Sequence, residues 1–175
     1  MAVEEALAGV LSRGLARDDG ADFRRDLARA GSLLYVADNA GEIAFDRLLV
    51  EEIRRERPGI RVRLAVKSGP ASSDATRADA EAVGFPEVAE VIETGGASLG
   101  VPRAYTSPFF WEAFSRADLV IAKGHANFET TDEEDHPGLY FLLTAKCSLV
   151  AGALGVRVGD SVLAKGKSAQ GQNRC

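Results

Sequence analysis

The sequence predicts one α/β domain with a mainly parallel, doubly wound sheet of about five to six strands, flanked by helices in three layers. Short apolar runs of strand length alternate with stretches of helical spacing along residues 31–165, which is typical of crossover units in a parallel sheet. The 175 residues are 46% hydrophobic and 27% charged, which is a globular composition. We therefore expect a single domain over 1–175, with a short helical lead-in over 1–30 and a polar tail over 166–175.

The lead-in has helical spacing before any strand pattern begins. A first helix is expected to end at Asp18-Asp19-Gly20, and a short amphipathic stretch with Phe23 and Leu27 follows it. If the apolar face of the first helix is not fully packed on the sheet, it would favour a homo-oligomer. That face carries Val3, Leu7, Val10, Leu11 and Leu15.

Strands and helices then alternate along the chain. Pro58-Gly59 ends the first helix after the lead-in, Asp74 stands in a capping position for the second, and the third carries Trp111, the only tryptophan. The expected helices are 41–57, 74–83 and 109–116. The expected strands are 33–37, 62–66, 88–92, 119–122, 139–145 and 161–164.

Polar residues follow several of these strands, where ligands bind in a doubly wound sheet. Asp38 and Asn39 follow the first strand, and Asp74 follows the second. Together they offer an oxygen-only ligand set that suits Mg²⁺ or Mn²⁺. The alternative is that both motifs are ordinary helix caps. Lys123 follows the fourth strand and suits a phosphate oxygen, and its alternative is a solvated lysine in a turn.

The histidines and cysteines are less informative. Zinc is disfavoured because His125 and His136 are the only histidines and no cysteine lies near either in sequence. His125 suits a general acid or base, and equally a neutral residue that lines the site. Cys147 is interpreted as a packed thiol. The acidic run 131–136 is interpreted as a solvated loop, with a second metal site there as the less favoured alternative.

Charge and hydropathy exclude several classes of protein. The net charge is −5, so the chain lacks the global basic footprint of a nucleic-acid-binding protein. No run approaches the length of a membrane-spanning helix, and the first residues lack the pattern of a signal peptide. The sequence therefore predicts a cytoplasmic protein that binds neither membrane nor nucleic acid.

Three motifs together resemble the DUF89 family, the metal-dependent damage-control phosphatases, and within it the compact prokaryotic branch with a shortened N-terminal helical region. The motifs are Asp38-Asn39-Ala40-Gly41-Glu42, Ser73-Asp74-Ala75-Thr76 and Lys123-Gly124-His125-Ala126-Asn127-Phe128-Glu129-Thr130. Two features depart from the family pattern: about 30 residues without cysteine precede Leu33, and Gly96-Ala97 stands where relatives tend to hold a Ser-Asp pair.

The resemblance implies a phosphatase that hydrolyses phosphate monoesters of small metabolites, such as sugar phosphates or phosphopantetheine-like compounds. A divalent ion (Mg, Mn, Co or Ni) would be held by Asp38, Asn39 and Asp74, and Lys123 would contact the substrate phosphate. Asp38, Asp74 and Lys123 are thus the expected catalytic residues, and either water or a carboxylate could attack phosphorus. The expected substrate-binding residues are Gly41, Glu42, Lys123, Gly124, Asn127 and Glu129.

Two alternatives stay open at this point. Some members of the family have been proposed to be carboxyl methyltransferases that use S-adenosylmethionine, although no glycine-rich loop follows the first strand here. The other alternative is a module that binds a metal and a phosphorylated metabolite without turning it over.

Overall fold

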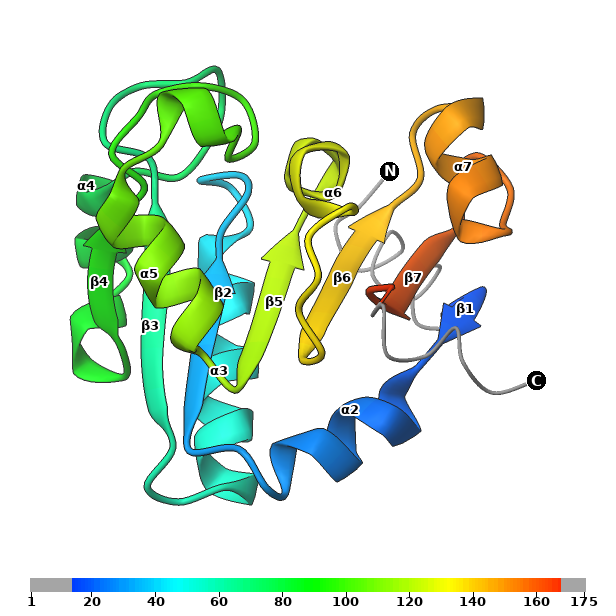
Figure 1. The fold of residues 1–175 in the computed structure, drawn as a ribbon. Coiled ribbons are helices and arrows are strands. Elements are labelled where there is room, and N and C mark those ends of the chain that lie inside the picture. The colour runs from blue at the N-terminus through cyan, green and yellow to red at the C-terminus, as the bar shows by residue number, and fades with distance from the viewer. Residues whose placement is uncertain (1–13, 168–175) are drawn as a thin grey trace, which may run out of the picture.

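A seven-stranded sheet forms the centre of the molecule (Figure 1). The computed structural model describes residues 14–167, so most of the first predicted helix, with Leu7 and Leu11, lies outside the described residues. The strand order is β1-β7-β6-β5-β2-β3-β4, and every neighbouring pair is parallel except β6 and β7. The predicted fold class is therefore confirmed. The strands are β1 (Arg17–Asp18), β2 (Ser32–Val36), β3 (Arg61–Val66), β4 (Glu90–Glu93), β5 (Leu119–Lys123), β6 (Leu139–Thr144) and β7 (Ser161–Lys165).

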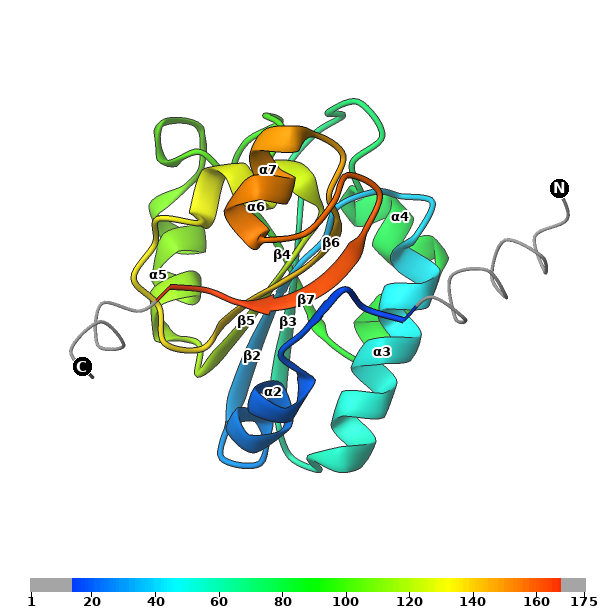
Figure 2. The same cartoon turned by 90° about the vertical axis from the view of Figure 1, so that its right-hand side faces the viewer.

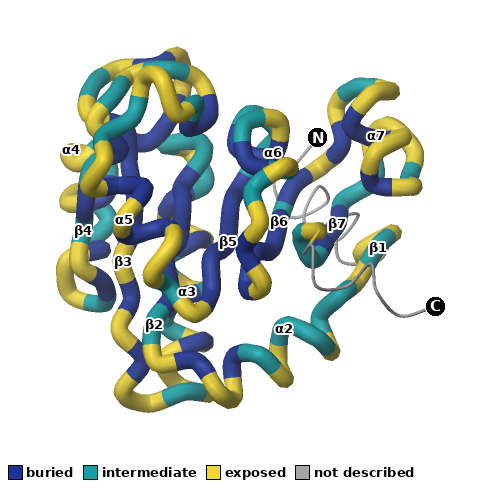
Figure 3. The backbone as a smooth tube through the Cα atoms, in the orientation of Figure 1, coloured by how far each residue is buried: buried dark blue, intermediate teal, exposed yellow. Residues whose placement is uncertain are grey.

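Within residues 14–167, six α-helices cover the two faces of the sheet. Helices α2, α3 and α4 contribute to one apolar core, and α5, α6 and α7 contribute to the other, so the molecule has three layers (Figure 2). The sheet between them is the most buried part of the chain, and its central strands are almost entirely inaccessible to solvent (Figure 3). The helices are α2 (Gly20–Leu27), α3 (Ile43–Glu56), α4 (Arg77–Ala82), α5 (Pro108–Arg116), α6 (His125–Thr131) and α7 (Ser148–Leu154).

The strand order reverses direction at β2. The chain passes from β2 to β3 and β4 on one side, then returns to place β5 and β6 on the other. Because crossovers in a parallel sheet are right-handed, the helices switch faces at this reversal, and the loops after β2 and β5 leave the sheet on opposite sides. The carboxyl ends of these two strands are the usual ligand position in such sheets.

Local sequence explains where the helices begin. Ser107 caps α5 by accepting a hydrogen bond from the backbone N–H of Phe110, and Pro108 occupies the first turn, where no N–H is needed. Helix α4 begins later than predicted. Its cap is Thr76, whose backbone N–H donates to Asp79 Oδ2 over 2.8 Å. The interpretation of Asp74 as a helix cap is therefore wrong.

Three short elements were not predicted. Strand β1 has only two residues, pairs with β7 and occupies the predicted end of the first helix. Helix α6 has few apolar positions and α7 is apolar at most of its positions, so neither shows a clear period. The acidic run is also less solvated than expected, because Thr131 and His136 at its ends are buried. Among residues 14–167, no helix has the length and apolar character needed to cross a membrane.

Candidate functional site

The predicted residues meet at the carboxyl ends of β2, β3 and β5. Asp38 and Asn39 follow β2, and Asn39 forms an isolated antiparallel bridge with Asp74 on the loop after β3. Two further backbone hydrogen bonds hold this loop in place, from Ala75 N–H to Asp38 O over 2.7 Å and from Ala40 N–H to Ser73 O over 2.8 Å. The fold thus brings Asp74 beside Asp38 and Asn39, which lie 36 and 35 positions earlier in the sequence.

The side chain of Asn39 is held on both of its ends. Its Nδ2 donates to Asp38 Oδ2 over 2.8 Å and to Glu42 Oε1 over 2.9 Å, and its Oδ1 accepts from Ser73 Oγ over 2.7 Å. The amide is therefore oriented before any ligand arrives, with its oxygen directed away from Asp38 and Glu42.

Gly124 lies directly against the Asp38 carboxylate. A Cβ atom added at Gly124 would overlap both carboxylate oxygens, and the residue has φ +81°, a conformation that side chains rarely adopt. Its predicted place in the site is explained by this close approach: β5 can end beside Asp38 only because the residue after it is glycine.

Negative charge accumulates at Asp38. Burial, together with the neighbouring Glu42 and Asp74 carboxylates, raises the pKa of Asp38 to about 6, and the cations of Lys146 and Lys123 only partly oppose this. A site with this excess of carboxylate oxygen is stabilised by a bound cation. The donors are carboxylate and amide oxygens, so the residues present fit a hard divalent ion such as Mg²⁺ or Mn²⁺.

Lys123 is not a solvated turn residue. It is 7% exposed, and its Nζ donates to Glu42 Oε2 over 2.6 Å and to Asp46 Oδ1 over 2.7 Å. Asp46 is itself buried and also accepts from Tyr35 OH over 2.7 Å. Burial raises the pKa of Asp46 even though Lys123 opposes it. The lysine therefore serves as counter-ion to two carboxylates of α3 and its cap.

Two further lysines lie at the same edge of the sheet, and the sequence analysis assigned them no role. Lys67 follows β3, is 3% exposed, and has its Nζ 3.5 Å from Asp74 Oδ2. Lys146 follows β6 and is exposed, and its charge lowers the pKa of Asp38. Their signal in the sequence is the same as for Lys123, namely a lysine directly at or just after a strand end.

The remaining predicted residues lie just before α3 or on α6. Gly41 and Glu42 precede α3 beside Asn39, with Glu42 as the N-cap. Asn127 is buried, and its Nδ2 donates to Ala37 O over 3.0 Å and to Lys123 O over 2.6 Å, so it joins the ends of β2 and β5. This supports the interpretation that Asn127 orders the loop after β5. The Glu129 carboxylate lies 3.4 Å from His125 Nε2.

His125 also lies beside Cys147. Their Nε2 and Sγ atoms are 3.6 Å apart, although the residues are 22 positions apart in sequence. The sequence argument against zinc considered only neighbours along the chain, whereas the fold places a cysteine beside His125. Cys147 is half-buried and packs against the apolar core to which α5, α6 and α7 contribute, in agreement with its interpretation as a packed thiol. Among the described residues, His125, Glu129 and Cys147 form the one cluster of three or more His, Cys, Asp or Glu residues whose ligand atoms lie within 4.8 Å of one another.

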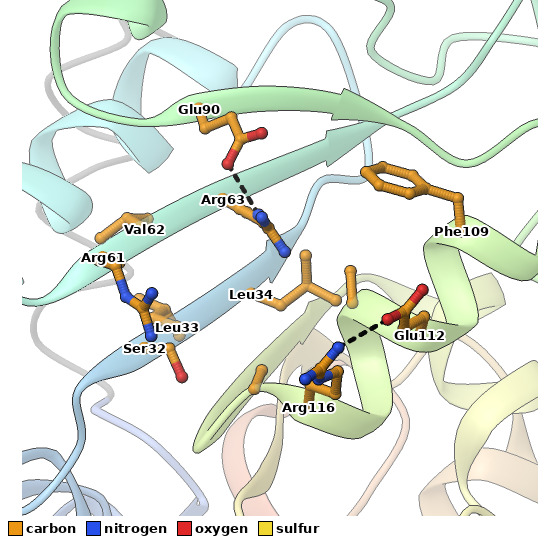
Figure 4. A pocket seen from close by; sticks show the side chains of 12 residues that line it. Ser32, Leu33, Leu34, Arg61, Val62, Arg63, Glu90, Phe109, Glu112 and Arg116 are labelled. Atoms are coloured by element: carbon orange, nitrogen blue, oxygen red, sulfur yellow. Dashed lines mark hydrogen bonds and ion pairs between the residues drawn. The ribbon is translucent and has the colours of Figure 1, made fainter.

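A separate cavity of about 370 Å³ lies at the opposite edge of the sheet, at the amino ends of β2 and β3 (Figure 4). Two ion pairs line it, Arg63 with Glu90 at 2.8 Å and Arg116 with Glu112 at 2.7 Å. Four of its charged side chains are thus paired with each other, and the cavity shares no lining residue with the Asp38 site.

Comparison with known proteins places these features in a family. The model of the damage-control phosphatase ARMT1-like domain matches residues 2–162. A damage-control phosphatase of Pyrococcus horikoshii is 41% identical over 94% of this chain and 57% of its own length. A second one, from Archaeoglobus fulgidus, is 39% identical over 76% of this chain and 46% of its own.

The same relationship appears in three dimensions. The crystal structure of a DUF89 family protein from Pyrococcus horikoshii superposes with a TM-score of 0.89 at 41% identity, over 94% of this chain and 57% of that one. The chain therefore spans about half the length of the curated relatives it matches.

Proposed function

Since this chain belongs to the damage-control phosphatase ARMT1-like (DUF89) family, we propose that it is a metal-dependent phosphatase that hydrolyses phosphate monoesters of small metabolites. The observation that carries the proposal is the meeting of Asp38, Asn39 and Asp74 at the point where the strand order reverses, with three lysines around them. Sugar phosphates and phosphopantetheine-like compounds are the substrate classes we propose.

In this proposal Asp38, Asn39 and Asp74 hold a divalent ion. When bound, such an ion neutralises charge on a phosphoryl group and orients it for displacement. The hydrogen bonds from Asn39 to Asp38 and Glu42, and from Ser73 to Asn39, hold the amide oxygen away from Asp38, so the Asn39 side chain would have to turn over to share an ion with Asp38. The raised pKa of Asp38 supports the need for a cation at this position.

The lysines have different roles. We propose Lys146 as the first contact of the substrate phosphate, because it is exposed and its charge reaches Asp38. Lys123 already has two carboxylate partners, so it can contact phosphate only where Glu42, which is partly exposed, gives way. Its main effect is to neutralise the start of α3. Lys67 is buried beside Asp74, and its charge would keep that carboxylate in place.

A phosphometabolite panel with Mg²⁺, Mn²⁺, Co²⁺ or Ni²⁺ tests the proposal on the full chain. Phosphate release should require a metal and stop in excess chelator. Asp38→Asn and Asp74→Asn should each lower kcat/KM by at least about 100-fold, since even residues that only support ligands cost 10–100-fold in metal affinity or activity. Glu93→Gln is the matched control, because it removes one exposed carboxylate near the same edge of the sheet.

The outcomes separate the alternatives. Release that persists in chelator, or survives in both aspartate variants, would refute the assignment of the metal ligands. Methyl transfer from S-adenosylmethionine without phosphate release would favour the methyltransferase. Metal binding without turnover of any compound on the panel would favour a binding module.

A further inference from the structure

A second group of ligand-type side chains lies on α6 and at the start of α7. His125 and Glu129 are one turn apart on α6, and Cys147 is the residue before α7. Both helices lie at the carboxyl end of the sheet, with the end of β6 between them (Figure 1). His125 and Cys147 are half-buried and Glu129 is exposed, so the cluster is accessible from solvent.

The distances in this cluster match those of a tetrahedral metal centre. With ordinary zinc bond lengths, tetrahedral angles separate a sulfur and a nitrogen ligand by about 3.6 Å and a nitrogen and an oxygen ligand by about 3.4 Å. In the structure, His125 Nε2 is 3.6 Å from Cys147 Sγ and 3.4 Å from Glu129 Oε1. All three ligand atoms lie within 4.8 Å of one another.

The donor types point to a different ion from the one proposed for Asp38. Thiolate, imidazole and carboxylate are the ligands of Zn²⁺ and similar borderline ions, whereas Mg²⁺ and Mn²⁺ prefer oxygen alone. Three protein ligands leave a fourth position for water, as in zinc sites that remain open. The cluster is therefore chemically distinct from the oxygen site at Asp38, Asn39 and Asp74.

We propose that His125, Glu129 and Cys147 form a second metal site, which takes a thiophilic divalent cation such as Zn²⁺ and links α6 to the start of α7. The proposal does not depend on phosphatase activity. On binding, the thiol releases its proton to solvent, and the imidazole proton moves from Nε2 to Nδ1, which leaves Nε2 free to bind. The cost is the hydrogen bond from Lys146 N–H to His125 Nδ1, which is long at 3.4 Å and therefore weak.

Cobalt titration is the test, with Co²⁺ as the spectroscopic probe. Because Co²⁺ could also fill the oxygen site, the full chain is studied in the Asp38→Asn background. A bound thiolate should produce a sulfur-to-cobalt charge-transfer band, and tetrahedral geometry should produce intense d–d bands. Zn²⁺ should abolish both, and a large excess of Mg²⁺ should not.

Single variants then identify the ligands. Cys147→Ser should remove the charge-transfer band, and His125→Gln and Glu129→Gln should each raise the Co²⁺ dissociation constant by at least about tenfold. Cys175→Ser is the matched control, since it removes the other cysteine of the chain and should leave the spectrum unchanged. Unchanged circular dichroism shows that each variant is folded.

Two results would overturn the proposal. One is a charge-transfer band that survives Cys147→Ser or is lost in Cys175→Ser, which would place the thiolate elsewhere. The other is a dissociation constant that neither His125→Gln nor Glu129→Gln alters, which would mean that a lone thiol binds the ion. Zn²⁺ should also raise the unfolding temperature of the Asp38→Asn chain but not that of its Cys147→Ser derivative, because an ion that binds only the folded state stabilises it.

Discussion

Replacing Lys123 by methionine should destabilise the protein strongly. Methionine keeps most of the apolar stem but removes the charge that pairs with Asp46 at 2.7 Å. The two side chains are only 9% and 4% exposed, so water cannot take the place of the lost cation. Tyr35 OH would remain as a donor to Asp46, but it is neutral. The variant therefore leaves a buried carboxylate without its counter-ion.

Removal of one partner of a buried ion pair costs about 3–5 kcal/mol, so we expect a fall of this size in the free energy of unfolding of Lys123→Met, measured in urea at neutral pH. The deficit should shrink as the pH falls toward about 4, because protonation neutralises Asp46. The sign follows from the direction of the pKa shift. When the pKa of a carboxyl group is higher in the native state than in the unfolded state, the free energy of unfolding decreases as the pH rises above the pKa of the unfolded state.

Two further variants isolate the cause. Arg77→Met breaks the exposed pair with Glu93, whose side chains are 44% and 40% exposed, and should cost less than about 1 kcal/mol. The double variant Lys123→Met with Asp46→Asn removes the unpaired charge and should be more stable than Lys123→Met alone. A Lys123→Met protein within about 0.5 kcal/mol of the wild type, a change typical of surface positions, would refute the reasoning.

Other predictions concern the site and its surroundings. Gly124→Ala should displace the Asp38 carboxylate and abolish binding of Mn²⁺. Gly152→Ala is the control and should leave binding unchanged, because there is open space around the added methyl group. Equal binding of Mn²⁺ by both variants would show that the approach of Gly124 to Asp38 is unimportant. The dissociation constant for Mn²⁺ should rise as the pH falls below about 6, because protons compete for Asp38, and a value unchanged between about pH 5 and about pH 7.5 would contradict its role as a ligand. Burial lowers the pKa of His136, which donates from Nε2 to Ala117 O and accepts at Nδ1 from Gly138 N–H. The unfolded chain therefore takes up a proton first, and the free energy of unfolding should fall as the pH drops below about 6.5, less steeply in His136→Asn.

The fold and the place of the candidate site could be predicted from the sequence because both depend on local pattern. The spacing of apolar residues within a segment predicts whether it is a strand or a helix, and the alternation of strands with helices implies a parallel sheet. The polar residues of the Asp38, Asp74 and Lys123 motifs each follow a strand, and parallel strands end at one edge, so their proximity follows from the same argument. Helices α6 and α7 were not predicted, because α6 has few apolar residues and α7 is apolar at most of its positions, so neither shows a helical period.

The partners of each side chain were decided by the tertiary structure alone. Lys123 pairs with Asp46, 77 positions away, and His125 meets Cys147, 22 positions away, because β5 lies between β2 and β6. The apolar spacing that identifies a strand records that it is buried and does not record which strand is its neighbour. The sequence by itself therefore determined that this protein is a doubly wound sheet with acidic and basic groups at one edge, and only the order of the strands decided which of those groups meet.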